Sequence, residues 1–485
     1  MTDQELVSQI AQEVISRLRG QLSGSPAASP AAAPAIQVSD AGDYGVFSNV
    51  DDAVKAAAIA QERVAAMSLD ERDQMISIIR RICLERSEEL ARMELAETKI
   101  GRLDHKIAKL TAMRQVPGVE ALRVAARTDA SGLCVIERAP WGVIGMVLPA
   151  THSVPTMVCN AISILAGGNT ALFNPHPAGA KCAAYALKLI NREIEKALGV
   201  KNVITTVSPA SIETAEAVFH HPDIALIVVT GGPGVVKAAS KSGKRVVAGG
   251  PGNPPVVVDE TADLDQAARC IIQGGSFDNG VLCIGEKQIF VVKKVADAFI
   301  EAMKRAGAFM LDFAAVEQLT GAAFTYDGGG RGCGRAHVKK ELVGKDVSVL
   351  AAAAGVKVPT GTDLLFGETK EDHPFVQEEQ MMPFVPVIRV GCIDAAIEAA
   401  FRSEHNYRHT AIIHSNSFVN VTKMAKKMNT TLFVHNAPST GALGVDGPGY
   451  FSYTIATPTG EGVTTPLTFT RERQIAFGAG LLRIT

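Results

Sequence analysis

The sequence predicts an α/β fold built on mostly parallel sheets and divided into more than one domain. From Val143 to Val247, short β-prone runs alternate with helical patterns, which is typical of a doubly wound parallel sheet. A chain of 485 residues is also longer than one hydrophobic core usually supports. Apolar residues make up 47% of the chain and charged residues 20%, as in ordinary soluble globular enzymes.

Charge, hydropathy and cysteine usage exclude several classes of protein. A formal net charge of -2 provides no field for nucleic acid or for an anionic membrane. No apolar run approaches the roughly 18 residues that span a bilayer, and the N-terminus lacks a secretory signal, so we expect a soluble, cytoplasmic protein. The eight cysteines form no CxxC pair, which indicates a reducing compartment without a zinc ribbon.

The N-terminal 44 residues are expected to stand apart from the rest of the chain. Residues 1–19 form an amphipathic helix in which Thr2 and Glu5 make a capping box. Residues 20–44 are a linker rich in Pro, Ala and Ser, with nothing to bury. Such a helix either docks onto a partner surface or is a frayed terminus whose periodicity is accidental.

The first large segment is helical and then alternates between strands and helices. Ser68 and Glu71 form a second capping box that opens a long helix ending at Thr98, before Gly101. The strands expected after it are 132–136, 143–148, 170–173, 203–207, 224–229 and 245–247, and the helices are 156–165, 178–198, 212–219 and 235–241.

Two of these strands end in motifs suited to ligand binding. In doubly wound sheets, ligands bind beyond the carboxyl ends of the strands. The first motif is Asn174-Pro175-His176-Pro177, where prolines fix the backbone. The second is Thr230-Gly231-Gly232-Pro233-Gly234, which suits a phosphate at a helix N-terminus, although a glycine turn here can also be just a tight connection.

A Gly- and Pro-rich patch at 248–255 predicts a boundary before a second αβ segment. The glycine-rich stretch 324–334, which contains Cys333, is expected to be a mobile loop. Beyond Asn436, β-prone runs are expected to extend a sheet, either this chain's own or that of a neighbouring subunit. The expected strands are 256–259, 288–292, 384–390, 410–414 and 432–434, with helices at 296–306 and 419–427.

Cys283 is the candidate nucleophile. It lies between a turn at Asn279 and Gly280 and the apolar run 288–292, where a loop can expose a thiol. A free cysteine is also among the most buried residue types, so local sequence alone favours a small core residue.

Cys159 and Cys270 are interpreted as core residues. His405 and His409 have the spacing of metal ligands on a helix, but no further ligand completes a site, so no metal is expected.

Several stretches together resemble the aldehyde dehydrogenase superfamily, and within it the CoA-acylating branch that includes propionaldehyde dehydrogenases of bacterial microcompartments. The resemblance covers about residues 45–480. The stretches are CNAISILAGGNTALFNPHPAGAKC (159–182), VVTGGPGVV (228–236), FDNGVLCIGEK (277–287), HPFVQEEQMMPFVP (373–386), EHNYRHTAIIHS (404–415), NAPSTGALG (436–444) and TIATPTGEGVTTPLTFTRER (454–473).

This resemblance implies a catalytic site at Cys283. The thiolate would attack an aldehyde, and backbone N–H groups with a side-chain donor near residues 152–160 would hold the oxyanion. Many relatives carry an asparagine where this chain has His152, so His152 is a donor, a base or a filler of the pocket, and these alternatives stay open. Asn160 is the nearest amide donor in sequence.

The resemblance also implies where the cofactor binds. Thr230 and the glycines Gly231, Gly232 and Gly234 match the turn over the NAD pyrophosphate. Residues Asn174 to Pro177 match the adenosine ribose side. Other branches often have a lysine and a glutamate there that contact the ribose, and both are missing here. The preference for NAD over NADP is therefore an expectation from the family only. Glu379 matches the glutamate that grips the nicotinamide ribose.

The fate of the acyl thioester separates the possible functions. Hydrolysing members have a glutamate in the patch before the catalytic loop, whereas this chain has Ala248-Gly249-Gly250-Pro251-Gly252. The expected reaction therefore converts a short aldehyde, propionaldehyde by resemblance, with NAD and coenzyme A into an acyl-CoA. The alternatives are a hydrolytic dehydrogenase and a catalytically silent cargo or scaffold protein.

The resemblance implies a domain arrangement and partners as well. Residues 45–126 and 144–252 would form the dinucleotide-binding domain, 253–440 the catalytic domain, and 127–143 with 441–485 an oligomerisation β extension. Residues 1–19 look like the encapsulation peptide that binds a microcompartment shell protein. A homo-oligomer, either dimer or tetramer, is expected.

Overall fold

The computed structural model describes residues 43–327, 335–445, 447–478 and 480. The helix expected at 1–19, most of the linker and Cys333 lie outside the described residues. No helix in the described part of the chain is both long and apolar enough to cross a bilayer.

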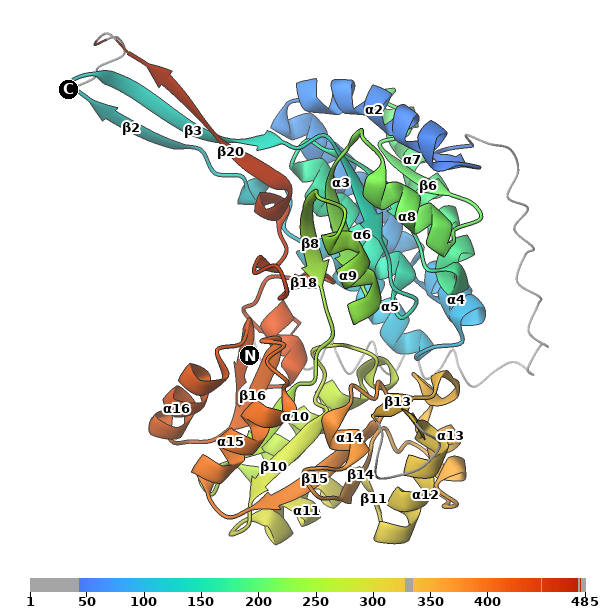
Figure 1. Ribbon diagram of the computed structural model, residues 1–485, viewed down its shortest axis with the longest axis vertical. Coiled ribbons are helices and arrows are strands. Elements are labelled where there is room, and N and C mark those ends of the chain that lie inside the picture. The colour runs from blue at the N-terminus through green and yellow to red at the C-terminus, as the bar shows by residue number, and fades with distance from the viewer. Residues whose placement is uncertain (1–42, 328–334, 446, 479, 481–485) are drawn as a thin grey trace, which may run out of the picture. The chain divides into compact units, whose positions relative to one another are not determined.

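The first sheet has six parallel strands in the order β1-β6-β5-β4-β7-β8 (Figure 1). The chain runs from β4 out to β6 at one side and returns to β7 at the other, so the switch point lies between β4 and β7. The strands are β1 Val46–Phe47, β4 Val143–Val147, β5 Thr170–Asn174, β6 Ile204–Val207, β7 Ile224–Thr230 and β8 Arg245–Gly249.

Helices pack around this sheet, so β4 and β5 are buried at every position, as in parallel sheets covered on both faces. These helices are α2 Val50–Ala66, α3 Leu69–Glu85, α4 Ser87–Thr98, α5 Leu103–Thr111, α6 Ser153–Ala166, α7 Ala180–Leu198, α8 Ile212–His220 and α9 Pro233–Ser240.

The second sheet has seven parallel strands in the order β11-β14-β15-β10-β9-β16-β17, drawn from yellow to orange in Figure 1. The strands are β9 Pro255–Val258, β10 Gln288–Val292, β11 Phe309–Leu311, β14 Leu365–Glu368, β15 Phe384–Val390, β16 Thr410–His414 and β17 Leu432–His435. The helices are α10 Leu264–Ser276, α11 Ala296–Arg305, α12 Phe313–Ala323, α13 Val347–Ala353, α14 Pro374–Gln377, α15 Ile393–Ser403 and α16 Phe418–Met428.

Three smaller antiparallel sheets complete the described fold. The chain beyond Asn436 does extend a sheet, and it is this chain's own, because β20 pairs with β3 along its whole length. β2 and β20 are largely exposed, and Figure 1 draws the three strands as a twisted ribbon. The sheets are β2 Ala125–Asp129 with β3 Gly132–Pro140 and β20 Thr470–Phe477, β12 Phe324–Tyr326 with β13 Ala336–Val338, and β18 Ile455–Ala456 with β19 Gly462–Val463.

The doubly wound α/β prediction is confirmed, with three local corrections. The helix expected from Ser68 to Thr98 is two helices, because the backbone leaves helical geometry at Arg86 (φ -111°, ψ 16°). The strand expected to end at Ile136 continues to Pro140. The stretch expected to be a loop from Phe324 begins as strand β12, paired with β13.

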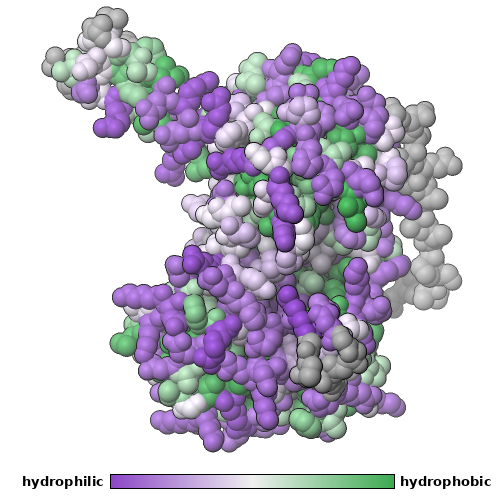
Figure 2. Space-filling model, in the orientation of Figure 1, coloured by the Kyte–Doolittle hydropathy of each residue, from purple (hydrophilic) through white to green (hydrophobic). Residues whose placement is uncertain are grey.

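Figure 2 shows hydrophilic side chains over most of the viewed face, with hydrophobic ones scattered between them. Large apolar side chains are instead concentrated between the helices and the sheets, where burial of apolar area is the main favourable contribution to folding.

Candidate active site

Cys283 lies in the loop between helix α10 and strand β10. The loop begins with a short 3-10 turn, η4 Phe277–Gly280, in which Asp278 and Asn279 have φ angles of 50° and 59°. Left-handed φ is uncommon for residues other than glycine, and two in succession need support from their surroundings. The Cys283 side chain itself is partly exposed.

Contacts on both sides hold this turn in place. The Asn279 amide donates to the Gly344 carbonyl at 3.0 Å and to the Asp346 carboxylate at 2.9 Å. Gly280 has φ 73°, and a Cβ atom there would lie 2.5 Å from the carbonyl oxygen of Met382. Only glycine fits at that position, so the turn before the thiol is defined by sterics as well as by hydrogen bonds.

The Cys283 thiol is in an environment that disfavours its anion. Burial raises the pKa of Cys283 to about 12, and the carboxylate of Glu379 raises it further, while Lys287 and the backbone N–H groups of Cys283 and Ile284 oppose the rise. The same backbone N–H groups donate to the sulfur and therefore stabilise the thiolate that attacks a carbonyl carbon. A proton acceptor is therefore needed to activate this thiol.

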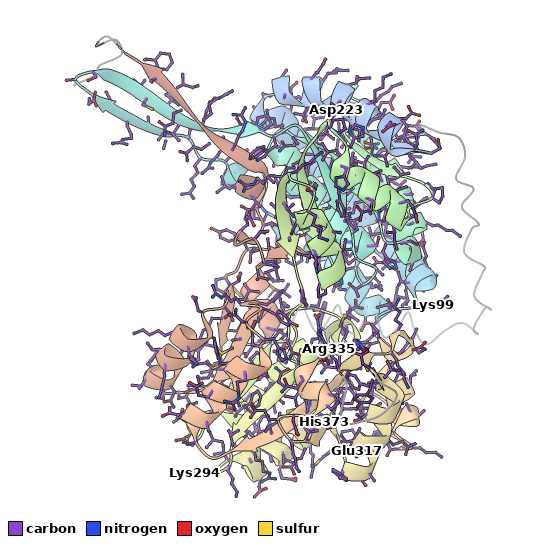
Figure 3. All side chains as sticks on the ribbon, in the orientation of Figure 1. Lys99, Asp223, Lys294, Glu317, Arg335 and His373 are labelled. Atoms are coloured by element: carbon purple, nitrogen blue, oxygen red, sulfur yellow. The ribbon has the colours of Figure 1, made fainter. Side chains whose placement is uncertain are left out.

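Glu379 lies close enough to Cys283 to act on it electrostatically and has the pKa that such an acceptor needs. Burial raises the pKa of Glu379 to about 7, against the opposing effects of Lys287 and the backbone N–H of Gly252. A carboxyl group that titrates near neutrality is well matched to proton transfer at physiological pH. Its neighbour Glu378 forms an ion pair of 3.5 Å with Arg335, which is labelled in Figure 3.

Lys287 and His409 also belong to this site, although no sequence pattern assigns either residue to the chemistry at Cys283. Lys287 is fully buried and donates to the carbonyl of Gly280. A Cβ atom at Gly252 would lie 2.6 Å from the Cys283 carbonyl oxygen and 3.0 Å from the His409 ring, so these groups are packed together. Burial, with Lys287 nearby, lowers the pKa of His409 to about 4, which makes the ring neutral.

His409 is therefore not the helical metal ligand considered above. It directly precedes β16, and its Nδ1 lies 2.8 Å from the Thr410 hydroxyl oxygen. Its Nε2 has no hydrogen-bond partner among the described residues. The sequence could not indicate that His409 lies near Cys283, because 126 positions separate the two residues and only the fold brings them together.

The two candidate oxyanion donors have different surroundings. Asn160 lies within α6, and its amide hydrogens are already engaged by the Thr156 carbonyl and the Thr454 hydroxyl, both at 2.9 Å. His152 is the N-cap residue of α6 and is 6% exposed. The His152 imidazole is held less tightly, because its Nε2 lies 3.3 Å from the Thr151 hydroxyl oxygen, a longer contact than the two that engage the Asn160 amide.

The glycine turn after β7 fits a nucleotide phosphate. It starts helix α9 at Pro233, and no side chain caps the free N–H groups at that end. Cβ atoms at Gly232 and Gly234 would meet no other atom within 4 Å, so the turn is open to a ligand. The Thr230 hydroxyl lies 3.0 Å from that of Thr454, which links this turn to Asn160.

The motif after β5 is less open. Asn174 is buried, donating to the Ser211 carbonyl at 3.4 Å and accepting from the Thr214 hydroxyl at 2.7 Å. Pro175 is buried too, whereas His176 and Pro177 are exposed at the sheet edge. Only the latter two therefore present side chains to a ligand on that side.

A small apolar cavity lies beside the catalytic loop. Its volume is about 60 Å³, which is room for about two methyl-sized groups. Leu282 and Ile284, the neighbours of Cys283 in sequence, are part of its wall. The other lining residues are Ala108, Lys109, Ala112, Phe277, Thr440, Leu443, Val445, Phe451 and Tyr453.

Comparison with known proteins gives one consistent result. The model of the aldehyde dehydrogenase family matches residues 31–310. The acetaldehyde dehydrogenase (acetylating) EutE of Salmonella typhimurium is 44% identical over 439 residues, which are 90% of this chain and 93% of that protein.

Two solved structures are similar over most of the chain. One is a Rhodopseudomonas palustris propionaldehyde dehydrogenase with bound CoA and an acylated cysteine (TM-score 0.87, 40% identity, covering 91% of this chain and 99% of that one). The other is a propionaldehyde dehydrogenase from the Clostridium phytofermentans fucose utilisation bacterial microcompartment (TM-score 0.87, 39% identity, covering 91% and 100%).

Proposed function

The chain belongs to the aldehyde dehydrogenase family, and from that premise we propose that it oxidises a short aliphatic aldehyde to an acyl-CoA. The observation that carries the proposal is the connection between β8 and β9. It passes directly against Cys283 at Gly252, yet residues 248–255 contain no carboxylate that could activate water. The acyl group on Cys283 is then left for the sulfur of coenzyme A.

The first half of the reaction oxidises the aldehyde on Cys283. The thiol loses its proton to the Glu379 carboxylate, and the sulfur bonds to the carbonyl carbon, which gives a thiohemiacetal oxyanion. The backbone N–H groups of Cys283 and Ile284 point at the reacting sulfur. NAD, when bound against Thr230 to Gly234, supplies the hydride acceptor, and Glu379 is the chain's candidate for holding its ribose.

The second half transfers the acyl group. Glu379 first gives the proton that it took from Cys283 to solvent. The sulfur of coenzyme A then bonds to the acyl carbon, the bond to the Cys283 sulfur breaks, and the proton of the incoming thiol passes by way of a base of the chain to the departing Cys283 thiolate. Glu379 is better suited to take it than His409, because a pKa of about 7 lies closer to that of a thiol than a pKa of about 4. The relative with an acylated cysteine and bound CoA supports this order of events.

The small cavity whose wall includes Leu282 and Ile284 favours an aldehyde with a short apolar chain. Room for about two methyl-sized groups suits acetaldehyde or propionaldehyde. The similar proteins include both an acetylating acetaldehyde dehydrogenase and propionaldehyde dehydrogenases. We therefore assign substrates of two or three carbons.

The proposal predicts that NADH formation depends on coenzyme A. With propionaldehyde and NAD, steady turnover should require coenzyme A and fall at least about tenfold without it, because the thioester then waits for water. NADH absorbance and chromatography of the product measure this. Equal rates with and without coenzyme A, or a free acid as the main product, would instead favour the hydrolytic alternative.

Hydrolysis is the second candidate because Glu379 could itself activate water. Its pKa of about 7 and its place near Cys283 give it the properties of the glutamate that is missing from residues 248–255. Glu379→Gln separates the two functions. If the enzyme transfers the acyl group to coenzyme A, the variant should be slower in both half-reactions, and neither it nor the wild type should produce a free acid. If the wild type produces a free acid and the variant does not, Glu379 is the base of a hydrolytic enzyme.

We also propose that residues 1–19 direct the enzyme into a bacterial microcompartment. The amphipathic pattern, the Pro/Ala linker and a similar protein from a microcompartment support this. Deleting residues 1–20 should leave the activity in solution unchanged while abolishing co-purification with shells. Undiminished co-purification of the shortened protein would contradict the proposal.

A further inference from the structure

Four fully buried charged side chains lie beneath the candidate active site. They are Glu94 of α4, Lys106 and Lys109 of α5, and Asp278 of the turn that precedes Cys283. Lys109 is paired with the Asp278 carboxylate, and Lys106 lies 3.3 Å from Glu94 and 3.9 Å from Asp278. Two cations and two carboxylates balance one another, as buried charges require.

This cluster touches the start of α6 at two points. The Glu94 carboxylate accepts the backbone N–H of Ser153 at 3.1 Å. The Lys109 amine lies 3.5 Å from Nδ1 of His152. The same cluster therefore contacts both the turn before Cys283 and His152, which stands where many relatives have an asparagine.

We propose that Lys109 is a positioning residue that keeps His152 as a neutral imidazole with its proton on Nε2, so that His152 donates to the oxygen of the reacting aldehyde. An ammonium group has N–H donors and no acceptor. Nδ1 of His152, facing that group, must then be the unprotonated nitrogen, and Nε2 carries the hydrogen. The inference rests on the proposed oxidation of an aldehyde at Cys283.

The surroundings of His152 support the neutral form. Burial and the nearby cations Lys109 and Lys106 hold the pKa of His152 well below its usual value, and Asp278 and a hydrogen bond with the backbone of Thr151 only partly oppose them. The Tyr453 ring packs at 5.7 Å from the imidazole and adds no charge, because burial raises the pKa of that phenol well above its usual value. Glu94, the remaining carboxylate nearby, is engaged by Lys106 and Ser153.

The geometry also connects Lys109 to the substrate. Lys109 and Tyr453 line the small cavity together with Leu282 and Ile284, which flank Cys283 in sequence. A side chain that contacts His152 and borders the same cavity is placed to orient a donor at the aldehyde oxygen. A neutral N–H donor here replaces the side-chain amide of many relatives without adding a charge to the site.

A double-mutant cycle tests the role of Lys109. The burst of NADH formation with propionaldehyde should fall at least about tenfold in Lys109→Met, but by less than about twofold when His152→Asn is already present. Lys106→Met is the matched control. It removes a cation of the same cluster that acts on His152 only at longer range, so its loss should change much less than that of Lys109→Met when His152→Asn is added.

The pH profile is a second readout that a purely structural role would not move. Removing the Lys109 cation raises the pKa of His152, so the acid limb of the burst rate should shift to higher pH in Lys109→Met. This shift should vanish when His152→Asn is added. If Lys109→Met does not fold, the double variant Lys109→Met with Asp278→Asn leaves the Lys106–Glu94 pair balanced, and it is compared with the wild type in the presence and absence of His152→Asn.

The outcomes distinguish the inference from the function on which it rests. Equal losses from Lys109→Met with and without His152→Asn, or an unshifted pH limb, would overturn the role of Lys109 while leaving the proposed reaction intact. A wild-type enzyme that gives no burst of NADH would overturn the proposed reaction itself.

Discussion

Replacing Cys283 with alanine is expected to lower aldehyde-dependent NADH formation by at least about 10⁴-fold, because no other cysteine among the residues that the structure describes lies in the site to form the thioester. The fold should be retained, since the side chain is small and partly exposed. Burst and steady-state absorbance measure the activity, and circular dichroism checks the fold.

Cys392→Ala is the matched control for this prediction. Cys392 is an exposed thiol at the start of α15 and has no part in the proposed chemistry, so its variant should retain full activity. A Cys283→Ala enzyme that keeps more than about one per cent of the wild-type rate would show that another nucleophile carries the reaction.

Replacing Asp278 with alanine is expected to destabilise the protein by about 3–5 kcal/mol, because it leaves the buried Lys109 and Lys106 without their shared carboxylate. The urea unfolding midpoint measures the loss. Glu88→Ala removes a partner from the exposed Arg92 pair and should cost about 0.5 kcal/mol or less. Similar shifts in the two variants would mean that the buried cluster contributes little.

The same carboxylate predicts a pH dependence of stability. Although burial raises the pKa of Asp278, Lys109, Lys106 and the backbone N–H of Arg102 outweigh it, so the net pKa lies below its usual value. A lowered folded-state pKa gives a contribution that is complete above the unfolded value and is lost as the pH falls through the folded value. The difference between wild type and Asp278→Ala should therefore shrink in acid.

The first sheet could be predicted from local sequence, whereas much of the second could not. Between β4 and β8, each strand is a short apolar run between helices with a clear amphipathic pattern, so the periodicity of apolar residues is sufficient to predict these elements. Helix α10 was missed because it ends in Gly274 and Gly275, which disfavour helix. The structure explains Gly274, since a Cβ atom there would lie 2.0 Å from the buried Glu286 carboxylate.

The active site was predictable only where motifs are continuous in sequence. Cys283 stands within one such stretch, and so do Glu379 and the turn from Thr230 to Gly234. The pairing of Asp278 with Lys109 joins positions 169 residues apart, and no periodicity marks it. The surroundings that set the pKa values of Cys283, Glu379 and His152 exist only in the folded chain.

The most direct test of the central claim follows the acyl group on Cys283. The enzyme is mixed with propionaldehyde and NAD, and intact-mass spectrometry is used to find a protein heavier by one propionyl group. Adding coenzyme A should discharge this adduct into propionyl-CoA at least about tenfold faster than water removes it. An adduct that water discharges just as fast, or an enzyme that forms NADH with no adduct at Cys283, would contradict the proposed reaction.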